Sequence, residues 1–490
     1  MEKSTSKPTY KELEKSLRKA EKRAKKAEDS LEKSKKEKLD LKRKIKELKS
    51  SKNTQNSKKK SMFDSGADRY FTERVERHTH PAYTILVGLM LYMYAGCSYR
   101  QVVKVMEVMR EVFSRALPWI FDDLPSHATI EDWAEKAGLA AMRSKAKGLD
   151  DTYALILDES VDIGGKKLLL GLAFNPECQG KPLRSTDVTV VEMSVAKSRN
   201  GEDIKESLEK IAKDTGNVPV YGLSDNGTNL DKGFELAGIP RHRDISHTFG
   251  SMLKSVYDDA EDFKEFVELI GRARRWTLTD KAALMPPNMR SLARYMNVYD
   301  WIEWAGKVLN VYQWLSKDEK DYLGFVPRHA SLVDELLEVK DCMVSIMETC
   351  KKGGLSEATA KTCREVIISG LLSHGSERMA KLGHKMLAYF DKELKLLKPN
   401  YKSHVISSDI IESIFGYYKG RKSPDKQAGI TCSALVIPLR TMFDPEECKP
   451  DSKLMSIFAT ETVNSVALWR KKNIGESNLA IRMSKLKKVG

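Results

Sequence analysis

The sequence has few of the features that mark exported, membrane-spanning or zinc-ribbon proteins. Its 490 residues include seven cysteines, an odd number, and no Cys-x-x-Cys pair, so neither a disulfide framework nor a zinc ribbon is indicated. The longest apolar run, residues 84–96, has 13 residues, whereas a membrane span needs about 18 or more. No signal-peptide pattern of basic, apolar and small residues opens the chain. These absences predict a soluble protein of a reducing, cytoplasmic compartment.

The composition is that of a folded, basic protein of several domains. Apolar residues make up 41% of the chain, which excludes collagen-like, mucin-like and wholly disordered proteins. At the usual ~150 residues per domain, about three domains are expected. The net charge is +15, but residues 1–60 hold 23 Lys and Arg against 10 Asp and Glu, which leaves 61 against 59 for the rest. The basicity therefore belongs to an N-terminal arm.

This arm has the periodicity of a coiled coil. Its seam follows steps of four and three through two polar positions, with Leu39 as the one large apolar residue off it. The seam residues are Leu13, Leu17, Ala20, Ala24, Ala27, Leu31, Ser34, Lys38, Leu41, Ile45 and Leu48. We expect a weak parallel dimer whose lysines also bind a polyanion; the alternative is a single charged helix. Residues 50–61 contain no apolar residue and are expected to form a flexible linker.

Residues 62–148 have a helical pattern. The apolar helix of residues 84–96 is followed by Ser98, which is placed to cap a helix over residues 99–113. A second helix is predicted near Thr129, whose spacing to Asp132 resembles a capping box. Two short helices with polar starts suit a helix-turn-helix DNA reader, in which Thr129, Glu131 and Trp133 belong to the second helix. Ordinary helical packing is the alternative.

From residue 151 the period changes to that of strands. Three strand-like runs are followed by a helix, a strand, a short helix and a strand, an order that predicts a mixed sheet of α/β type. The expected strands lie within residues 152–160, 164–177, 185–198, 218–227 and 241–246, and the helices within 200–216 and around 234–236. The first and fourth strands both end in an aspartate, Asp158 and Asp225.

These two aspartates indicate a metal site. Neighbouring parallel strands that finish together place Asp158 and Asp225 at the same carboxyl edge of the sheet, where α/β proteins bind ligands. Two adjacent carboxylates repel unless a cation lies between them, and Mg²⁺ takes carboxylate oxygens while keeping water and phosphate ligands. With a third carboxylate such a site can hold two ions about 4 Å apart. A strand-end Asp alone is a weak signal, because such residues often only cap a turn.

The order of these elements resembles the RNase H-like core of DDE/D transposases and integrases, a family that takes its third carboxylate from a later helix. The candidate is Glu412, in the segment SSDIIESIFGYYKGRKSP, followed seven positions later by Lys419. This spacing resembles the Glu-x6-Lys part of the signature helix of insertion-sequence transposases. Val405 and Ser408 stand where that signature has Tyr and Arg, which leaves the subfamily open. The resemblance covers roughly residues 80–430.

The resemblance implies a DNA transposase that hydrolyses and rejoins phosphodiester bonds. Asp158, Asp225 and Glu412 are then the catalytic residues and the ligands of two Mg²⁺ ions, which Mn²⁺ can replace. The implied partners are double-stranded DNA of the transposon ends and the target, and at least one further copy of the chain, because two ends must be held together. In a eukaryote the protein would be nuclear.

The resemblance also divides the chain into regions. An interrupted RNase H-like core accounts for the 186 residues between Asp225 and Glu412, which are mostly helical by period. The predicted regions are the coiled coil (1–49), the linker (50–61), the helical DNA-binding region (62–148), the first part of the core (149–250), a helical insertion (251–403), the final core helix (404–430) and a basic helical tail (431–490).

Other residues compete for the acidic roles. Glu159 and Asp162 flank Asp158, but with Leu155 and Leu157 in the core, the first acid after the apolar run is expected to be the inward ligand. Asp409 precedes Glu412 by three residues and is a second candidate for ligand or for helix cap.

One histidine belongs to a short motif. The segment from Asp244 to His247 resembles the Cys/Asp-x2-His element found after the second Asp in several cut-and-paste transposases. His247 is expected to orient the scissile phosphate or a nearby carboxylate, and a purely structural strand-end histidine is the alternative.

Basic and aromatic residues gather within the expected insertion. Arginines bind phosphate bidentately and a tryptophan can hold an unstacked base, although Trp301 and Trp304 have apolar neighbours that favour core packing. The group consists of Arg272, Arg274, Arg275, Trp276, Arg290, Arg294 and Trp301. The residues we expect to contact DNA are Lys419, His247, Arg274, Arg275, Trp276, Lys58, Lys59 and Lys60.

Two other functions fit the same sequence. A catalytically inactive DNA-binding or scaffolding protein would keep the sheet and bind DNA with a steep salt dependence, without metal-dependent nicking. An RNase H-like nuclease would cleave DNA without joining ends.

Overall fold

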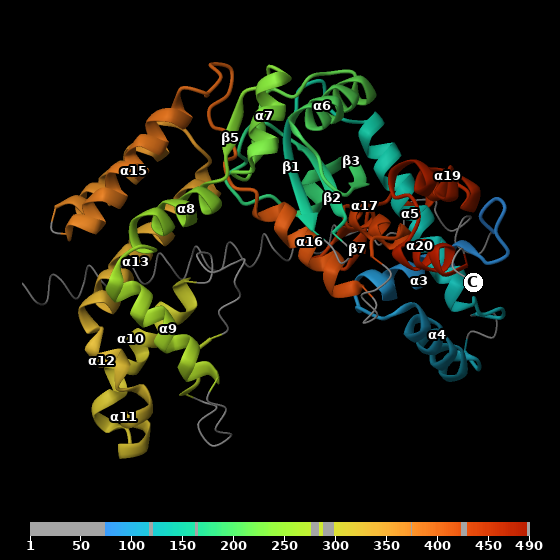
Figure 1. Cartoon of the computed structure of the whole chain (residues 1–490). Coiled ribbons are helices and arrows are strands. Elements are labelled where there is room, and N and C mark those ends of the chain that lie inside the picture. The colour runs from blue at the N-terminus through green and yellow to red at the C-terminus, as the bar shows by residue number, and fades with distance from the viewer. Residues whose placement is uncertain are drawn as a thin grey trace, which may run out of the picture. The chain divides into compact units, whose positions relative to one another are not determined.

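The computed structural model describes residues 74–116, 121–161, 165–275, 284–287, 298–373, 375–422 and 429–487 (Figure 1). By their contacts, the described residues belong to one compact unit that begins at Arg74. The predicted coiled coil (1–49) and linker (50–61) lie outside the described residues. Within the described ranges, no helix combines the length and apolarity that crossing a membrane requires.

Three helices open the described chain. They are α3 (Ala82–Met93), α4 (Tyr99–Phe113) and α5 (His127–Lys147). The prediction that Ser98 caps the second of them is confirmed, because its side chain accepts from the amide of Gln101 while the Gln101 side chain accepts from the Ser98 amide. The third helix starts earlier than expected, since its cap is Ser126 rather than Thr129.

Helix α5 is largely enclosed. Ile130 and Ala137 are 0% exposed and Trp133 is 2% exposed, and the helix packs against β3 and the later helix α17 (Val436–Arg440). A recognition helix must present its side chains to a groove of DNA. The burial of α5 therefore favours ordinary helical packing over the helix-turn-helix reading of this segment.

The contact between α5 and the turn before α17 depends on a glycine. A Cβ built on Gly138 would lie 2.0 Å from the carbonyl oxygen of Leu435, which is buried backbone that cannot yield without moving the helices. We expect Gly138→Ala to lower the free energy of unfolding by about 3 kcal/mol, at the upper end of overpacking costs. Guanidinium denaturation of the full chain measures this.

A second helical glycine provides the control. Gly416 lies in α16 (Asp409–Arg421), and no heavy atom lies within 4 Å of a Cβ built there. Gly416→Ala should stabilise the protein by about 0.5–1 kcal/mol, because alanine is the better helix former. Equal changes in the free energy of unfolding for the two substitutions would contradict the close approach of Gly138 to the Leu435 carbonyl.

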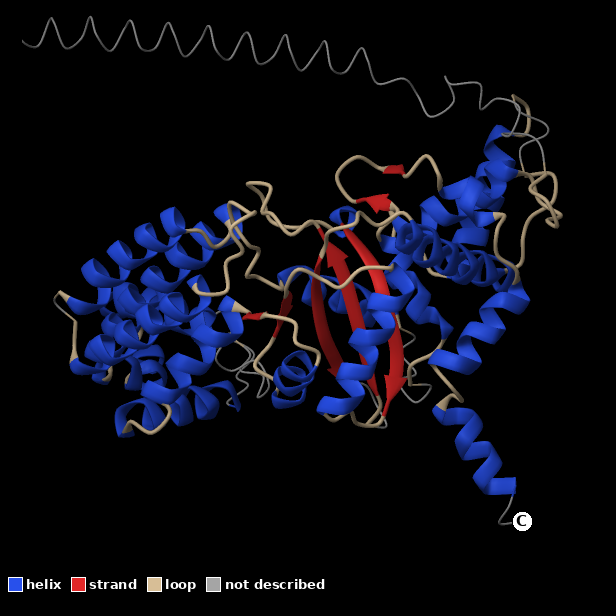
Figure 2. Ribbon diagram, turned by 90° about the horizontal axis from the view of Figure 1, so that it is seen from above, coloured by secondary structure: helices blue, strands red, loops and turns tan. Residues whose placement is uncertain are grey.

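The predicted mixed sheet of α/β type is present. Its five strands are β1 (Ala154–Val161), β2 (Lys167–Phe174), β3 (Val188–Ala196), β4 (Gly222–Ser224) and β5 (Arg241–Arg243). Their spatial order is β3-β2-β1-β4-β5. Figure 2 draws the strands as red arrows. The first three strands pair antiparallel, whereas β4 runs parallel to β1 and β5 runs parallel to β4.

The register of the parallel strands aligns three aspartates. Leu155 of β1 pairs with Gly222 of β4, so continuing the register by three residues sets Asp158 opposite Asp225. Ser224 pairs with Arg243 of β5, so the next step sets Asp225 opposite Asp244. The carboxyl edge of the parallel part of the sheet therefore carries one aspartate for each of its three strands.

Two helices cover one face of the sheet. Leu155 and Leu157 of β1 share a core cluster with Ile204 of α6 (Gly201–Thr215) and Phe234 of α7 (Thr228–Leu236). Both helices were predicted, as was Gly216, the residue just past α6, which has a φ of 84°. Because successive side chains alternate along a strand, Ile156 and Asp158 face the opposite side, where α16 contacts β1.

The described residues between β5 and α16 are mostly helical. The helices are α8 (Ile245–Tyr257), α9 (Glu261–Arg275), α10 (Val298–Val311), α11 (Lys317–Leu323), α12 (Phe325–Arg328), α13 (Ala330–Gly353), α14 (Glu357–Ile367) and α15 (Glu377–Leu394), with shorter turns η4 (Tyr312–Trp314) and η5 (Ile368–Leu372). They share one apolar core. The chain turns at residues 258–260 between α8 and α9.

A buried polar group joins this helical segment to the sheet. His242 of β5 bonds the Glu393 carboxylate of α15 through Nδ1 at 2.8 Å and the Nδ1 of His404 through Nε2 at 2.8 Å. All three residues are 0% exposed. The side chain of Tyr221 stacks on the His404 ring, with the ring centroids 4.2 Å apart.

The chain ends in short elements and two helices. They are η7 (Cys432–Leu435), α17, β6 (Phe443–Asp444), β7 (Lys449–Pro450), α18 (Leu454–Phe458), α19 (Val463–Asn473) and α20 (Asn478–Lys487). The prediction that the cysteines form no disulfide framework is confirmed, because all seven are free.

Candidate active site

Asp158 lies in β1, just beyond the residues that pair with β4. The pairing of β1 with β4 covers Leu155 and Ile156, and β1 continues past Asp158 to Val161, still paired with β2. The prediction that the first strand ends at Asp158 was therefore wrong. Its Oδ1 accepts a hydrogen bond from the amide of Glu159 at 2.7 Å.

The neighbouring acid Glu159 faces the other side of the sheet. It pairs with Arg199 at 3.0 Å, with both side chains under 10% exposed, and accepts a bond from Asn229. The preference for Asp158 over Glu159 agrees with this arrangement, but the reason given for it was wrong. Glu159 shares its face with Leu155 and Leu157, and Asp158 lies on the opposite one. Asp162 lies outside the described residues.

Asp225 directly follows β4. Its Oδ1 accepts from the amide of Gly227 at 2.9 Å, which leaves the other carboxylate oxygen for a ligand. The Asp225 carbonyl is held by Arg241 of β5 at 2.8 Å. The backbone at this position is therefore fixed from two directions.

Glu412 and His247 meet in front of these aspartates. Glu412 is in the first turn of α16 and His247 is in the first turn of α8, and the Glu412 Oε1 lies 2.7 Å from the His247 Nε2. Both side chains are partly exposed, at 44% and 33%. The charges of Glu412, Asp225 and His247 all act on Asp158, so four side chains from distant parts of the sequence converge here.

Asp244 fixes the positions of both helices. It is the N-cap of α8 and accepts from the His247 amide at 2.7 Å. Its other oxygen accepts from the amide of Ser408 at 2.6 Å and from the Ser408 hydroxyl at 2.9 Å. Ser408 immediately precedes α16. The buried Asp244 carboxylate therefore fixes the N-terminal ends of both α8, which carries His247, and α16, which carries Glu412. This role of Asp244 was not predicted from the sequence.

The convergence changes the protonation of two groups. Burial, reinforced by the negative charge of Asp225, raises the pKa of Asp158 to about 7. The hydrogen bond to Glu412 raises the pKa of His247 to about 9, against an opposing effect of burial. At neutral pH His247 is therefore a cation, and it neutralises part of the acidic cluster.

These two shifts predict a pH dependence of stability in the absence of divalent metal. His247 has a pKa of 6.5 when unperturbed and of about 9 when folded, so its stabilising effect is complete below pH 6.5 and is lost as the pH rises through 9. The raised pKa of Asp158 acts in the same direction between 3.8 and about 7. We expect the melting temperature in EDTA to fall from about pH 6 to pH 10. His247→Gln should flatten the upper part of this fall, and an equally steep fall in that variant would refute the assignment.

The donor types fit a hard divalent cation, because Mg²⁺ prefers carboxylate oxygens. Among the described residues, however, no three His, Cys, Asp or Glu side chains are close enough together to share one ion. Glu412 is directed at His247 instead. Metal binding at this site requires the Glu412 side chain to turn from His247 towards Asp158 and Asp225.

The competing acid Asp409 is engaged elsewhere. Its carboxylate pairs with Lys351 of α13 at 2.5 Å, and it provides no side-chain cap for α16. The preference for Glu412 over Asp409 agrees with these contacts.

Only part of the expected DNA-binding group can be placed. Lys419 is exposed on α16, two turns after Glu412 and on the same side of the helix. Arg274 donates to the carbonyl of Pro286 at 2.5 Å, and Arg275 is exposed at the end of α9. Lys58, Lys59, Lys60, Trp276, Arg290 and Arg294 lie outside the described residues.

The tryptophans of the helical segment differ in exposure. Trp301 is 0% exposed, and the Trp304 indole donates to the Leu284 carbonyl at 3.1 Å while its ring packs on the core. The preference for core packing is therefore confirmed for both. Trp314, which the sequence analysis did not consider, is 75% exposed.

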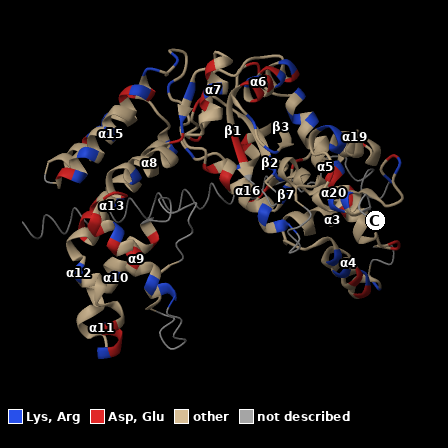
Figure 3. Cartoon of the chain, in the orientation of Figure 1, with Lys and Arg blue, Asp and Glu red and all other residues tan. Residues whose placement is uncertain are grey.

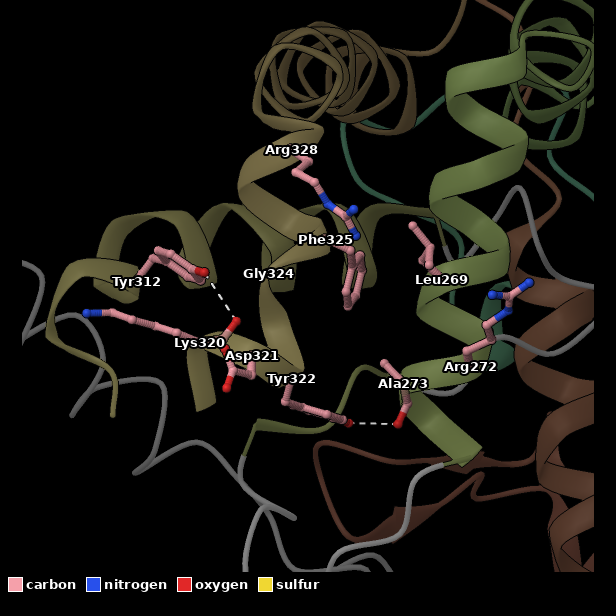
Figure 4. A pocket seen from close by; sticks show the side chains of 10 residues that line it. All are labelled: Leu269, Arg272, Ala273, Tyr312, Lys320, Asp321, Tyr322, Gly324, Phe325 and Arg328. Carbon is pink, nitrogen blue, oxygen red and sulfur yellow. Dashed lines mark hydrogen bonds between the residues drawn. The ribbon is translucent and has the colours of Figure 1, made fainter. Parts of the chain in front are cut away.

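The helical segment also contains an open hollow, separate from the acidic cluster. Its volume is about 490 Å³, and Figure 4 shows Arg328 beside Phe325, with α9 on one side and Tyr312 on the other. The hydroxyl of Tyr322 donates to the Ala273 carbonyl at 2.7 Å. None of the residues predicted to be catalytic lines this hollow.

No family model matches this chain, and no curated protein is significantly similar to it.

Proposed function

We propose that this protein is a DDE-type DNA transposase, which hydrolyses and rejoins DNA phosphodiester bonds. The observation that carries the proposal is the meeting of Asp158, Asp225, Glu412 and His247 at one sheet edge. The residues come from β1, the end of β4, α16 and α8, over more than half of the chain. A cluster of acids with one cation and few other contacts has no evident structural role.

The fold supports the same proposal. A sheet of order β3-β2-β1-β4-β5, with three antiparallel strands followed by two parallel ones, agrees with an RNase H-like core. The helical segment between β5 and α16 agrees with an insertion before the last carboxylate. The position of Asp225 opposite Asp158 in the register is the relation that such a core requires.

The chain's own residues would hold and orient the reacting groups. Asp158, Asp225 and Glu412 would hold two Mg²⁺ ions, which activate the attacking oxygen and stabilise the leaving one when bound. His247, as a cation at neutral pH, would bind a phosphate oxygen once Glu412 leaves it. Lys419 would hold the DNA backbone further along α16.

In the first proposed reaction, water attacks phosphorus and the bond to the 3′ oxygen breaks, which leaves a 3′ hydroxyl and a 5′ phosphate. In the second, that 3′ hydroxyl attacks a target phosphodiester, so one phosphorus–oxygen bond forms as another breaks. Neither step requires an oxidant or a further co-reactant.

The test uses the purified full chain, Mg²⁺ and DNA taken from either side of the coding sequence, where inverted repeats of a mobile element would lie. We expect nicked or cut DNA, and joined products when pre-cleaved ends are supplied. Cleavage without joining would identify a nuclease instead.

A second candidate is a catalytically inactive DNA-binding protein. It is favoured by one observation. Glu412, the proposed third carboxylate, is paired with His247, and no three potential metal ligands in the described part of the chain lie close together. Salt-sensitive DNA binding without cleavage in either Mg²⁺ or Mn²⁺ would establish this alternative.

A further inference from the structure

Two arginines from different helices face one tyrosine. The guanidinium carbons of Arg421, at the end of α16, and Arg440, at the end of α17, each lie 4.6 Å from the centre of the Tyr417 ring. Arg421 also lies 4.4 Å from the Tyr92 ring and donates to the Met93 carbonyl of α3 at 3.3 Å. Figure 3 shows this basic end of α16 beside α3.

Neither arginine forms an ion pair with a carboxylate among the described residues. Arg378, which is also half-buried, pairs by contrast with Asp262 at 2.8 Å. Asp444 and Glu447 act together with Arg440 on the Tyr94 hydroxyl, and neither acid forms an ion pair with Arg440. Two like charges on one ring repel each other, and a bound anion would remove that cost.

We propose that Arg421 and Arg440 together bind one phosphate group of the DNA backbone. Guanidinium groups bind phosphate oxygens in pairs of parallel hydrogen bonds, and the aromatic rings of Tyr417 and Tyr92 hold Arg421 in place. Both arginines are half-exposed, so a phosphate can reach them. The identity of the ligand as DNA depends on the proposed function, but the anion site does not.

The location indicates which part of the DNA is bound. Arg421 is nine residues after Glu412 on α16, which is about 13 Å along the helix axis, comparable to the axial rise of about four nucleotides. It lies on the opposite side of α16 from Glu412, at about 180°. The contacted phosphate is therefore on DNA that passes the C-terminal end of α16, away from the reacting bond.

The first experiment measures binding of the full chain to duplex DNA at several salt concentrations without divalent metal. Each phosphate contact contributes about 0.9 to the slope of log affinity against log salt. Arg421→Gln and Arg440→Gln should each weaken binding, and the double variant should reduce the slope by about 0.9 and not by about 1.8, because both side chains bind one phosphate. Arg364→Gln is the matched control, since Arg364 pairs with Asp391 at 2.6 Å and should leave the slope unchanged.

The second experiment separates the anion site from the DNA. Inorganic phosphate, compared with KCl at equal ionic strength, should raise the melting temperature of the wild type but not of Arg440→Gln. Stabilisation by phosphate without a change of salt slope would overturn the assignment of DNA as the ligand. An unchanged slope together with equal phosphate effects would overturn the site itself.

One further variant separates loss of binding from loss of folding. If Arg440→Gln does not fold, Arg440→Lys, which keeps the charge but loses the paired donors, must still weaken the phosphate effect. A wild type without salt-sensitive DNA binding would count against the proposed function, while the phosphate experiment would still decide the anion site.

Discussion

Asp225→Asn is expected to lower the rate of Mg²⁺-dependent DNA cleavage by about 1,000-fold or more. A metal-ion site contributes several kcal/mol to transition-state stabilisation, and each 1.36 kcal/mol corresponds to about a factor of ten in rate. Asp158→Asn and Glu412→Gln should have effects of the same size, because in the proposed site the three carboxylates hold the same ions. The measurement is the single-turnover cleavage rate at saturating metal.

Asp409→Asn is the matched control for these variants. It removes an equally exposed acid from the same helix, one turn before Glu412, and Asp409 is paired with Lys351. Its cleavage rate should stay within a few-fold of the wild type. If Asp409→Asn were inactive and Glu412→Gln active, the third carboxylate would have been assigned to the wrong residue.

Asp244→Ala is expected to lower the free energy of unfolding by about 3 kcal/mol. It removes the cap of α8, which is worth about 1 kcal/mol, and leaves the buried amide and hydroxyl of Ser408 without their acceptor, at about 1–3 kcal/mol. Burial raises the pKa of Asp244, so the loss of an unfavourable buried charge offsets part of this cost. Chemical denaturation of the full chain measures the difference.

The same substitution should also disturb the site, because Asp244 fixes the start of both α8 and α16. The pKa of His247 should fall from about 9 towards its ordinary 6.5 as Glu412 and Asp244 no longer face it. Ser316→Ala is the control, since Ser316 caps the exposed helix α11 with its side chain and should cost only about 1 kcal/mol. Equal losses of stability in the two variants would contradict the inference that Asp244 fixes the start of both α8 and α16.

The sequence was sufficient to predict the sheet and its acidic edge. Strand period and turn residues locate all five strands, and the order of elements predicts the parallel pairing that aligns Asp158 with Asp225. These features depend on local pattern, which is readable along the chain.

The remaining features depend on contacts between distant residues. The His247–Glu412 and Asp244–Ser408 contacts join segments about 165 residues apart, and no periodicity encodes such pairs. A local signal for Asp244 did exist, because Asp before an apolar helical run is a capping pattern. The burial of α5 could not be predicted from local pattern either, because many of the residues that cover it belong to the C-terminal part of the chain.

The central claim is that Asp158, Asp225 and Glu412 form a single metal site, and localised oxidative cleavage tests it most directly. Fe²⁺ bound in place of Mg²⁺, with ascorbate and peroxide, generates radicals that cut the polypeptide beside the metal. Our account predicts cuts near all three residues of the full chain, suppressed by excess Mg²⁺ and absent in Asp225→Asn. Cuts near only one of them, or a pattern unchanged in that variant, would contradict the account.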